Sequence, residues 1–404
     1  MPVKDALARI LDAATPITDV ETVPLARAFG RTLAHDVASR RTQPPFAVSA
    51  MDGYALRAAD VADGKRARLV GESAAGRGHG GALAPGDAVC IFTGAPVPDG
   101  ADAILIQEDA IVADGLVAAT APPQPGRYIR HAGLDFAQGA VGLAKGTRLG
   151  PSELALAAAM NHPALPVVRK PRVAILASGD ELVMPGEEPG PDQIVCSNPF
   201  AVAAYVEGAG GEPIDLGIAR DDFASLEAAI TRAQDARADA LVTLGGASVG
   251  DHDLIQSALA RAGMRLGFWR IAMRPGKPLI HGALGPMSIL GLPGNPVSSI
   301  VCSLMFLLPL LRKLQGDPAA GEDESEEAVL GKDLGPNDGR ADYLRATLVR
   351  DAEGRWVATP FELQDSSMLR VLTEAQCLLL RAPHASAARK GQPCRVLRLR
   401  RGGF

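Results

Sequence analysis

Residues 240–253 read ALVTLGGASVGDHD, an apolar run that passes directly into a glycine-rich turn and then into acidic residues. A short continuous apolar run bounded by glycine predicts a strand that is buried on both faces. The same succession occurs twice more, where 173–177 runs into the turn 178–181 and where 288–292 runs into the turn 293–296. These stretches predict parallel strands of one sheet, with a turn at the carboxyl end of each.

Helical patterns between the strands extend this prediction. A fourth apolar strand is expected at 213–217. Helices are expected at 199–207, 223–236, 253–262 and 297–311. Because alternating strands and helices form a sheet that is covered on both faces, we predict an α/β domain with a central parallel sheet at 170–318.

The rest of the chain separates by pattern. Apolar residues recur at helical spacing within 1–40 and 140–169, while 41–139 consists of short β-like runs divided by Gly and Pro. This predicts a helical domain that is split by a β-rich insertion. After an acidic linker, 325–404 reads as a small all-β domain. The runs are 67–70, 88–93, 103–107 and 111–120 in the insertion, and 343–349, 355–359, 377–381 and 394–399 in the last domain.

Composition excludes several classes of protein. A formal net charge of -5 over 404 residues, without a basic stripe, argues against a general nucleic-acid binder. The five cysteines are scattered, which indicates reduced thiols and not a disulfide framework or a zinc site. The most apolar stretch, 300–311, is shorter than the about 20 residues of a membrane span. Since the N-terminus reads as a folded helix and not as a signal peptide, we expect a soluble cytoplasmic protein with no membrane partner.

The three glycine-containing turns are the first candidates for a binding site. Ligands of open parallel sheets bind outside the carboxyl ends of the strands, and glycine lets a phosphate approach the backbone closely. None of the turns matches a Rossmann or a Walker motif, so neither a dinucleotide site nor an ordinary P-loop is indicated. The alternative is that these glycines close tight turns and that polar residues cap helices.

Carboxylates gather near the same expected edge. They are Asp180, Glu181, Asp221 and Asp253. Magnesium prefers one or two carboxylates, several waters and substrate phosphates, so a loose acidic cluster suits it. N-capping is the alternative for Asp221 and Asp253, which stand where helices are expected to begin.

Cations are concentrated at 268–278, in the sequence FWRIAMRPGKP. Arg270 and Arg274 lie on one face of an extended chain, and Lys277 follows beyond a Pro-Gly turn. These side chains suit a phosphate or another oxyanion. The alternative is a solvated edge strand that charge and proline protect from further pairing.

Six segments together resemble the MoeA family, which includes the E domain of gephyrin. They are 49–55, 93–102, 178–182, 245–253, 275–278 and 292–298. The resemblance implies a split helical domain with a β insertion, a molybdopterin-binding α/β domain and a small C-terminal β-barrel. It also implies an elongated homodimer with clefts between subunits. The implied activity is that of a molybdopterin molybdenumtransferase, which converts adenylylated molybdopterin and molybdate into molybdenum cofactor and AMP with Mg2+.

The resemblance also implies functional residues. The implied catalytic residues are Asp52, Glu181 and Asp221, and the implied metal ligands are Asp180, Glu181 and Asp253. The implied substrate-binding residues are Thr93, Ser178, Gly179, Gly245, Gly246, Ser248, Gly250, Arg270, Arg274, Lys277, Pro278, Pro293, Gly294, Asn295, Arg345 and Ser366, and Asp135 matches a further cleft position.

The chain departs from the family's common pattern at several of these positions. Arg270 and Arg274 stand where many members have lysine, which keeps the charge but changes the hydrogen-bond geometry. Leu134 replaces a frequent glutamate, and 365–367 replaces a more glycine-rich stretch.

Two other functions stay open at this point. A molybdopterin adenylyltransferase would use a similar α/β domain, and a scaffold would bind partner peptides as the gephyrin E domain does. The β insertion and the last β domain favour the molybdenumtransferase. Its expected partners are the two substrates, a second copy of the chain, and the adenylyltransferase and other cofactor-assembly proteins.

Overall fold

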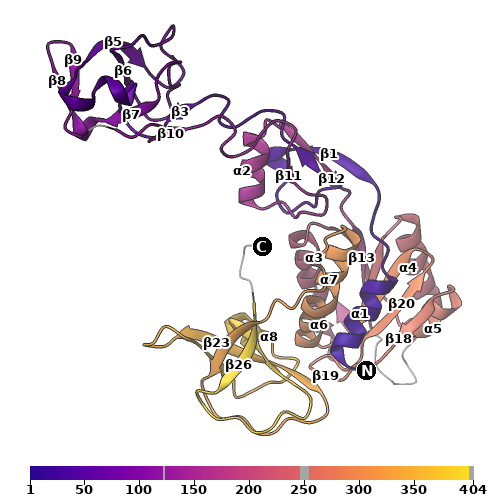
Figure 1. Ribbon diagram of the computed structural model, residues 1–404. Coiled ribbons are helices and arrows are strands. Elements are labelled where there is room, and N and C mark those ends of the chain that lie inside the picture. The colour runs from indigo at the N-terminus through magenta and orange to yellow at the C-terminus, as the bar shows by residue number, and fades with distance from the viewer. Residues whose placement is uncertain (122, 246–253, 400–404) are drawn as a thin grey trace.

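The computed structural model describes residues 1–121, 123–245 and 254–399 (Figure 1). The chain is elongated. A β-rich unit with β3 to β10 lies at one end, and the α/β domain and a C-terminal β domain lie at the other. A small unit with β1, β11, β12 and α2 connects the two ends (Figure 1).

The α/β domain is built on a six-stranded sheet of order β16-β13-β17-β21-β20-β18. The strands are β13 (Arg172–Ser178), β16 (Glu212–Ala219), β17 (Ala240–Leu244), β18 (Arg265–Phe268), β20 (Ile280–Leu284) and β21 (Met287–Leu292). The four predicted strands are parallel, but β20 and β18 are antiparallel to their neighbours, so the sheet is mixed. Strand β20 is antiparallel to β21 because a tight turn at Gly285 joins them, and so short a connection can only form an antiparallel hairpin.

Helices cover both faces of this sheet, as predicted. They are α3 (Asn198–Gly208), α4 (Phe223–Asp235), α5 (Leu254–Arg261), and a continuous helix of α6 (Pro296–Cys302), the π-helical η5 (Ser303–Leu307) and α7 (Leu308–Leu314). Val173 and Ile175 enter one hydrophobic core, whereas Ala174 and Leu176 enter the other. Alternate residues of a strand point to opposite faces, which explains why every residue between Arg172 and Ser178 of β13 is apolar.

One helix, Pro296–Leu314, is long and apolar enough by length and composition to cross a membrane. Its most apolar window is 67% buried inside the protein. Phe306, Leu307, Leu310 and Leu311 are fully buried in the core that also contains β13. This burial agrees with the prediction of a core helix.

The N-terminal helix α1 (Val3–Ala13) belongs to the α/β domain. Ala6 and Ile10 are fully buried in the core that contains α7. The prediction of helix for the following residues to 40 is wrong, because β1 (Val20–Pro24), the 3-10 turn η1 (Leu25–Arg27) and β2 (Val37–Ala38) occupy them. β-Branched side chains and Pro24 explain the strand, since both disfavour a helix.

The two halves of the split domain pair with each other. Strand β1 is antiparallel to β12 (Ala164–Val168), and β2 is antiparallel to β11 (Val141–Leu143). Helix α2 (Pro151–Ala159) packs with Leu33 and Leu165 in the core of this unit. The predicted insertion therefore leaves and re-enters the domain between paired strands.

The insertion contains a six-stranded sheet of order β7-β4-β6-β5-β9-β8. Its strands are β4 (Gly53–Leu56), β5 (Ala67–Ser73), β6 (Asp87–Ile91), β7 (Ala103–Ile106), β8 (Ala110–Ala113) and β9 (Leu116–Ala119), and β3 (Val48–Ser49) pairs with β10 (Ile129–Arg130) beside them. The predicted single run 111–120 is a hairpin, because Asp114 and Gly115 adopt positive φ in a two-residue turn.

The C-terminal domain is a closed barrel, as the resemblance implies. Its strands are β22 (Glu326–Leu330), β23 (Ala341–Arg350), β24 (Trp356–Pro360), β25 (Cys377–Arg381) and β26 (Pro393–Arg398), with α8 (Leu369–Glu374) between β24 and β25. Pairing of β23 with both β24 and β25 closes the ring. The two-residue β19 (Met273–Arg274) of the α/β domain joins this sheet beside β23, and Tyr343 and Leu378 of the barrel enter the α/β core.

The docking of α1 predicts an effect on stability. Ile10→Ala should lower the free energy of unfolding of the α/β domain by about 2 to 5 kcal/mol, because it leaves a cavity in a packed core. Urea unfolding of a Trp356→Phe background, followed by the fluorescence of Trp269, measures this domain. As a control, Ile111→Ala at a 57% exposed position should change it by less than about 0.5 kcal/mol. Equal small effects of both changes would show that α1 is not part of the core.

Candidate active site

A cavity of about 700 Å3 lies at the carboxyl ends of β13, β17 and β21. Nine residues that the sequence predicted as site residues line it: Ser178, Gly179, Glu181, Asp221, Gly245, Pro278, Pro293, Gly294 and Asn295. They come from all three predicted turns, because parallel strands end at the same edge of the sheet. The structure therefore brings these nine residues together at one edge of the sheet, where the sequence predicts a binding site.

In the first turn, the Glu181 carboxylate occupies the space that a side chain at Gly179 would need. This glycine has a φ of +146°, and a Cβ added to it would overlap the Glu181 carboxylate. The neighbouring Asp180 accepts a hydrogen bond at 3.3 Å from the backbone N–H of Asp221 and does not line the cavity. Glu181 and Asp221 thus share the cavity, while Asp180 links the two turns that carry them.

The second turn begins at Gly245, which has a φ of +97°. A Cβ there would come within 2.8 Å of the Ser178 carbonyl oxygen, so glycine allows two neighbouring strand ends to approach each other. The predicted residues Gly246, Ser248, Gly250 and Asp253 lie outside the described residues.

The third turn leads into α6. The side-chain amide of Asn198 donates a hydrogen bond at 2.7 Å to the Gly294 carbonyl and fixes the turn against α3. The backbone N–H of Val297 donates at 3.0 Å to the Ser366 carbonyl of the barrel. Ser366 therefore contacts the site through its backbone, whereas its neighbour Ser367 lines the cavity.

Sequence reasoning missed one wall of the cavity. Strands β14 (Leu182–Val183) and β15 (Ile194–Val195) pair with each other, and Ile194, Val195, Cys196 and Ser197 line the cavity beside Asn198. Two-residue strands have no detectable periodicity. The helix-start signal Ser197-Asn198-Pro199 could have pointed to this wall, because helix starts face the same edge.

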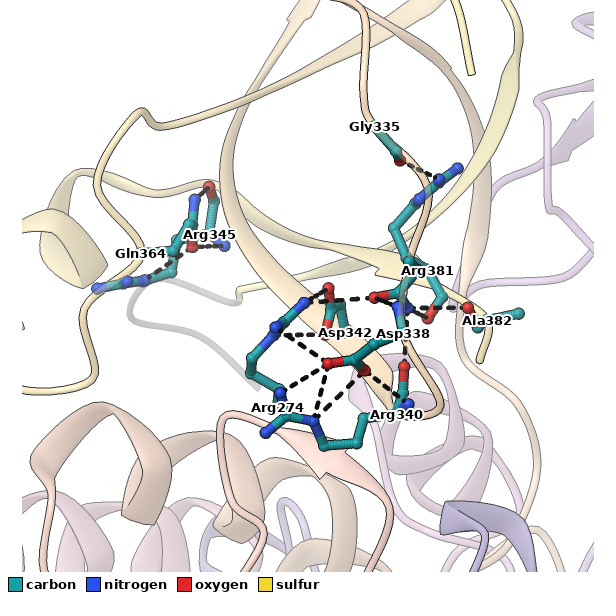
Figure 2. A network of polar contacts seen from close by, with 10 residues as sticks. Arg274, Gly335, Asp338, Arg340, Asp342, Arg345, Gln364, Arg381 and Ala382 are labelled. Carbon is teal, nitrogen blue, oxygen red and sulfur yellow. Dashed lines mark hydrogen bonds and ion pairs between the residues drawn. The ribbon is translucent and has the colours of Figure 1, made fainter. Parts of the chain in front are cut away.

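The three predicted cations are not gathered in the cavity. Arg270 lies over the Trp269 ring at 4.2 Å, and Arg274 forms an ion pair with Asp342 of the barrel (Figure 2). Lys277 is exposed next to Pro278, which lines the cavity. Because β19 is an edge strand of the barrel sheet, the edge-strand alternative describes Arg274 better than a free anion ligand does.

Arg345 of β23 is 1% exposed, and its guanidinium donates to Gln364 Oε1 and to the Met368 carbonyl, both at 3.3 Å. In the described part of the chain it has no carboxylate within ion-pair distance. Burial lowers the pKa of Arg345, and the nearby Asp365 opposes this shift. A buried guanidinium without an ionic partner suits an anion.

Asp52 and Thr93 contact each other in the insertion. The Asp52 carboxylate accepts hydrogen bonds from the Thr93 backbone N–H at 2.7 Å and from the Thr93 hydroxyl at 2.8 Å. These bonds lower the pKa of Asp52. Asp52 follows β3 and Thr93 follows β6, and these strands lie at the opposite end of the molecule from the α/β domain (Figure 1). The structure therefore unites Asp52 with Thr93 but not with Glu181, which lines the cavity. The backbone N–H of Asp135 donates a hydrogen bond to the Gln43 carbonyl, within the same predicted insertion.

The residues 1–121, 123–245 and 254–399 contain no group of three or more His, Cys, Asp or Glu side chains that could hold a metal ion. Of the four carboxylates of the predicted acidic cluster, Asp180, Glu181 and Asp221 lie in this part of the chain, at or next to the cavity. Asp180 bonds to the Asp221 backbone, which leaves Glu181 and Asp221 as the carboxylates of the cavity.

The relatives of this chain agree with this arrangement. The molybdopterin molybdenumtransferase of Haemophilus influenzae is 34% identical over 364 residues, which cover 90% of each chain. The chain belongs to the MoeA family. Residues 1–161 match the family described as MoeA N-terminal region (domain I and II), 174–313 match the probable molybdopterin binding domain, and 327–399 match the MoeA C-terminal region (domain IV).

Other comparisons cover a similar extent. The molybdopterin molybdenumtransferase of a Nostoc species is 40% identical over 306 residues, or 74% of this chain and 70% of that one. A crystal structure of the molybdopterin biosynthesis MoeA protein from Pyrococcus horikoshii covers 98% of this chain and 99% of its own, with a TM-score of 0.84 and 28% identity. In this MoeA-family chain the arrangement of all the units therefore has a solved counterpart.

The Asp52–Thr93 contact predicts a measurable pKa. Asp52 should titrate below the ordinary aspartate value of 3.8, and Thr93→Val should raise its pKa only part of the way, because the stronger backbone hydrogen bond remains. Carboxyl 13C NMR titration measures both values. Since the folded pKa is lowered, the stability that this bond contributes is present at neutral pH and is lost as the pH falls through the folded pKa. An identical Asp52 pKa in both proteins would exclude the hydroxyl contact.

Proposed function

We propose that this chain is a molybdopterin molybdenumtransferase that takes adenylylated molybdopterin and molybdate and releases molybdenum cofactor and AMP. The observation that carries this proposal is the large cavity at the strand ends, where three glycine-containing turns meet two carboxylates. Its substrate is a nucleotide-linked pterin, and the absence of side chains at Gly179, Gly245 and Gly294 lets phosphate groups approach the backbone. The continuous helix that starts at Pro296 directs its positive end toward the same space.

Magnesium fits this site as part of the proposal. Mg2+ is usually held by one or two carboxylates, with waters and substrate phosphates as the other ligands, and Glu181 and Asp221 supply two carboxylates in the cavity. Asp180 would orient Asp221 through its backbone hydrogen bond. A bound Mg2+ would neutralise charge on the leaving AMP as a Lewis acid. The glycine-containing turns of the chain would bind the pyrophosphate beside these carboxylates.

Molybdate requires a cationic site next to the pterin. Lys277 adjoins the cavity-lining Pro278 and makes no ion pair within the described residues. The buried Arg345 likewise makes none there, and it donates a hydrogen bond to the carbonyl of Met368, the residue after the cavity-lining Ser367. Hydrogen bonds from charged donors to an oxyanion are among the strong ones, so these two residues are the proposed molybdate ligands. Arg274 is already neutralised by Asp342 and is proposed for another role below.

A second copy of the chain would complete the site. Near Asp52, the apolar side chains of Phe46, Met51 and Phe92 are exposed, although they lie beside polar catalytic candidates. Near the cavity, Met184, Ile194, Val195 and Phe200 are exposed in the same way. Exposed apolar patches at both places are suited to association, and a homodimer would place Asp52 and Thr93 of one chain at the cavity of its partner.

The rival enzyme function is adenylylation of the pterin. That reaction needs ATP, so incubation with ATP and molybdopterin but without molybdate distinguishes it. The MoeA N-terminal and C-terminal regions around the α/β domain support the transferase. A scaffold function has no observation in its favour here. The five free cysteines are compatible with the proposed cytoplasmic location, where the adenylyltransferase would supply the substrate.

Replacement of Glu181 tests the proposed function. Glu181→Gln should reduce molybdate-dependent AMP release by about a hundredfold, because it removes a charge from the metal site. Excess Mg2+ should restore part of the rate, and the Tm should barely move because the side chain is exposed.

Glu187→Gln is the matched control. Glu187 lies in the loop between β14 and β15, accepts a hydrogen bond from the Met184 N–H and does not line the cavity. This variant should keep the wild-type rate. Full activity of Glu181→Gln at limiting Mg2+ would remove the metal assignment, and a wild-type protein that releases no AMP with molybdate would remove the function.

A further inference from the structure

The loop 271–278 connects the cavity to the barrel. At its base, the Ile271 N–H donates a hydrogen bond at 3.1 Å to the Lys277 carbonyl. Its middle is the short strand β19, which pairs in parallel with the first two residues of β23. Its C-terminal residue, Pro278, lines the cavity. The Ile271–Lys277 hydrogen bond closes the loop, and β19 attaches it to the barrel. The position of Lys277 and Pro278 therefore depends on the barrel.

A two-pronged ion pair adds to the backbone pairing of β19 with β23. The guanidinium of Arg274 binds both carboxylate oxygens of Asp342, with Nε donating to Oδ1 at 2.8 Å (Figure 2). The Asp342 side chain is 7% exposed, whereas that of Arg274 is 46% exposed. The buried carboxylate has a fixed position, so the two-pronged contact fixes the arginine in turn.

The other contacts of Arg274 are weaker. Asp338 lies 3.5 Å away and has a closer ion pair with Arg340 at 2.7 Å, while Asn337 accepts a hydrogen bond at 3.3 Å (Figure 2). Asp338 is half exposed, which weakens its ion pair through solvent screening. Asp342 is therefore the strongest side-chain partner of Arg274 among these residues.

The barrel reaches the cavity at a second point. The Ser366 carbonyl accepts the Val297 N–H at the start of α6, and Ser367 lines the cavity. The barrel thus contacts the loop 271–278 through the Asp342–Arg274 pair, and the start of α6 through Ser366.

We propose that Asp342 is a positioning residue, which holds the loop 271–278 through its ion pair with Arg274 and thereby sets Lys277 and Pro278 at the cavity. Arginine is matched to this task, because lysine cannot bind both oxygens of a carboxylate in one plane. The proposal rests on the proposed function for its effect on catalysis, but its structural part stands independently.

Hydrogen exchange and kinetics of Asp342→Asn test this proposal. Amide exchange in 271–277 of the free full-length protein should become about tenfold to hundredfold faster, because a charge-assisted pair to a buried carboxylate is lost. In the molybdate-dependent AMP assay, the KM for molybdate should rise by a similar factor, while kcat changes less. Arg274→Lys should give an intermediate effect on both quantities, since one contact remains.

Asp351→Asn is the matched control. Asp351 follows the far end of β23 and pairs with Arg355 at 2.8 Å, so this variant breaks an Arg–Asp pair in the same barrel. It should leave both quantities unchanged. Unchanged exchange in 271–277 of Asp342→Asn would overturn the proposal, as would a uniform rise in exchange over the whole chain in both Asp342→Asn and Arg274→Lys. A wild-type protein without AMP release would refute only the proposed function, because the exchange result does not depend on turnover.

Discussion

The antiparallel ladder between β1 and β12 determines where everything else in the molecule lies. It pairs Val20 with Val168 and continues to Pro24 and Ala164, so the chain leaves and re-enters the region of the α/β domain at one place. Arg169 clamps this base by binding both carboxylate oxygens of Asp239, at 2.9 and 3.0 Å, and by pairing with Asp19. Everything between the two strands is therefore an arm that extends from the domain (Figure 1).

The arm separates two groups of candidate catalytic residues. The hydrogen-bonded Asp52 and Thr93 lie near its end, while Glu181 and Asp221 lie in the cavity of the α/β domain. In the structure the arm extends away from the α/β domain of its own chain (Figure 1). The proposed homodimer agrees with this arrangement, because the arm of a partner would take the place at the cavity that the chain's own arm leaves open. The barrel closes the cavity from another side, and the Arg274–Asp342 pair sets its distance.

The sequence predicted those features whose signal lies within a few neighbouring residues. The strand Ala240–Leu244 was predicted with its observed ends, because all five of its residues are buried and glycine follows at once. The three turns could be assigned to one edge by the geometry of parallel strands. Helix α1 was predicted as a helix, but its amphipathic pattern does not say which domain its apolar face meets.

Features that depend on distant partners could not be predicted. Arg274 reads as a free cation in the sequence, since its partner Asp342 is 68 residues away. The wall formed by β14 and β15 has too few residues for a periodic pattern, and β20 is antiparallel because of the short turn before β21. The separation of Asp52 from the cavity is likewise invisible in the sequence, because it follows from the pairing of β1 with β12.

Complementation between two inactive variants tests whether each active site is built from two chains. Asp52→Asn and Glu181→Gln chains carrying different affinity tags are co-expressed, and the molybdate-dependent AMP release of the mixture is measured. Each variant alone should be nearly inactive. A random mixture should recover about a quarter of the wild-type rate, because half of the dimers contain one site with both intact residues. A doubly tagged dimer that is isolated and remains inactive, or a monomeric wild-type protein with full activity, would contradict the account.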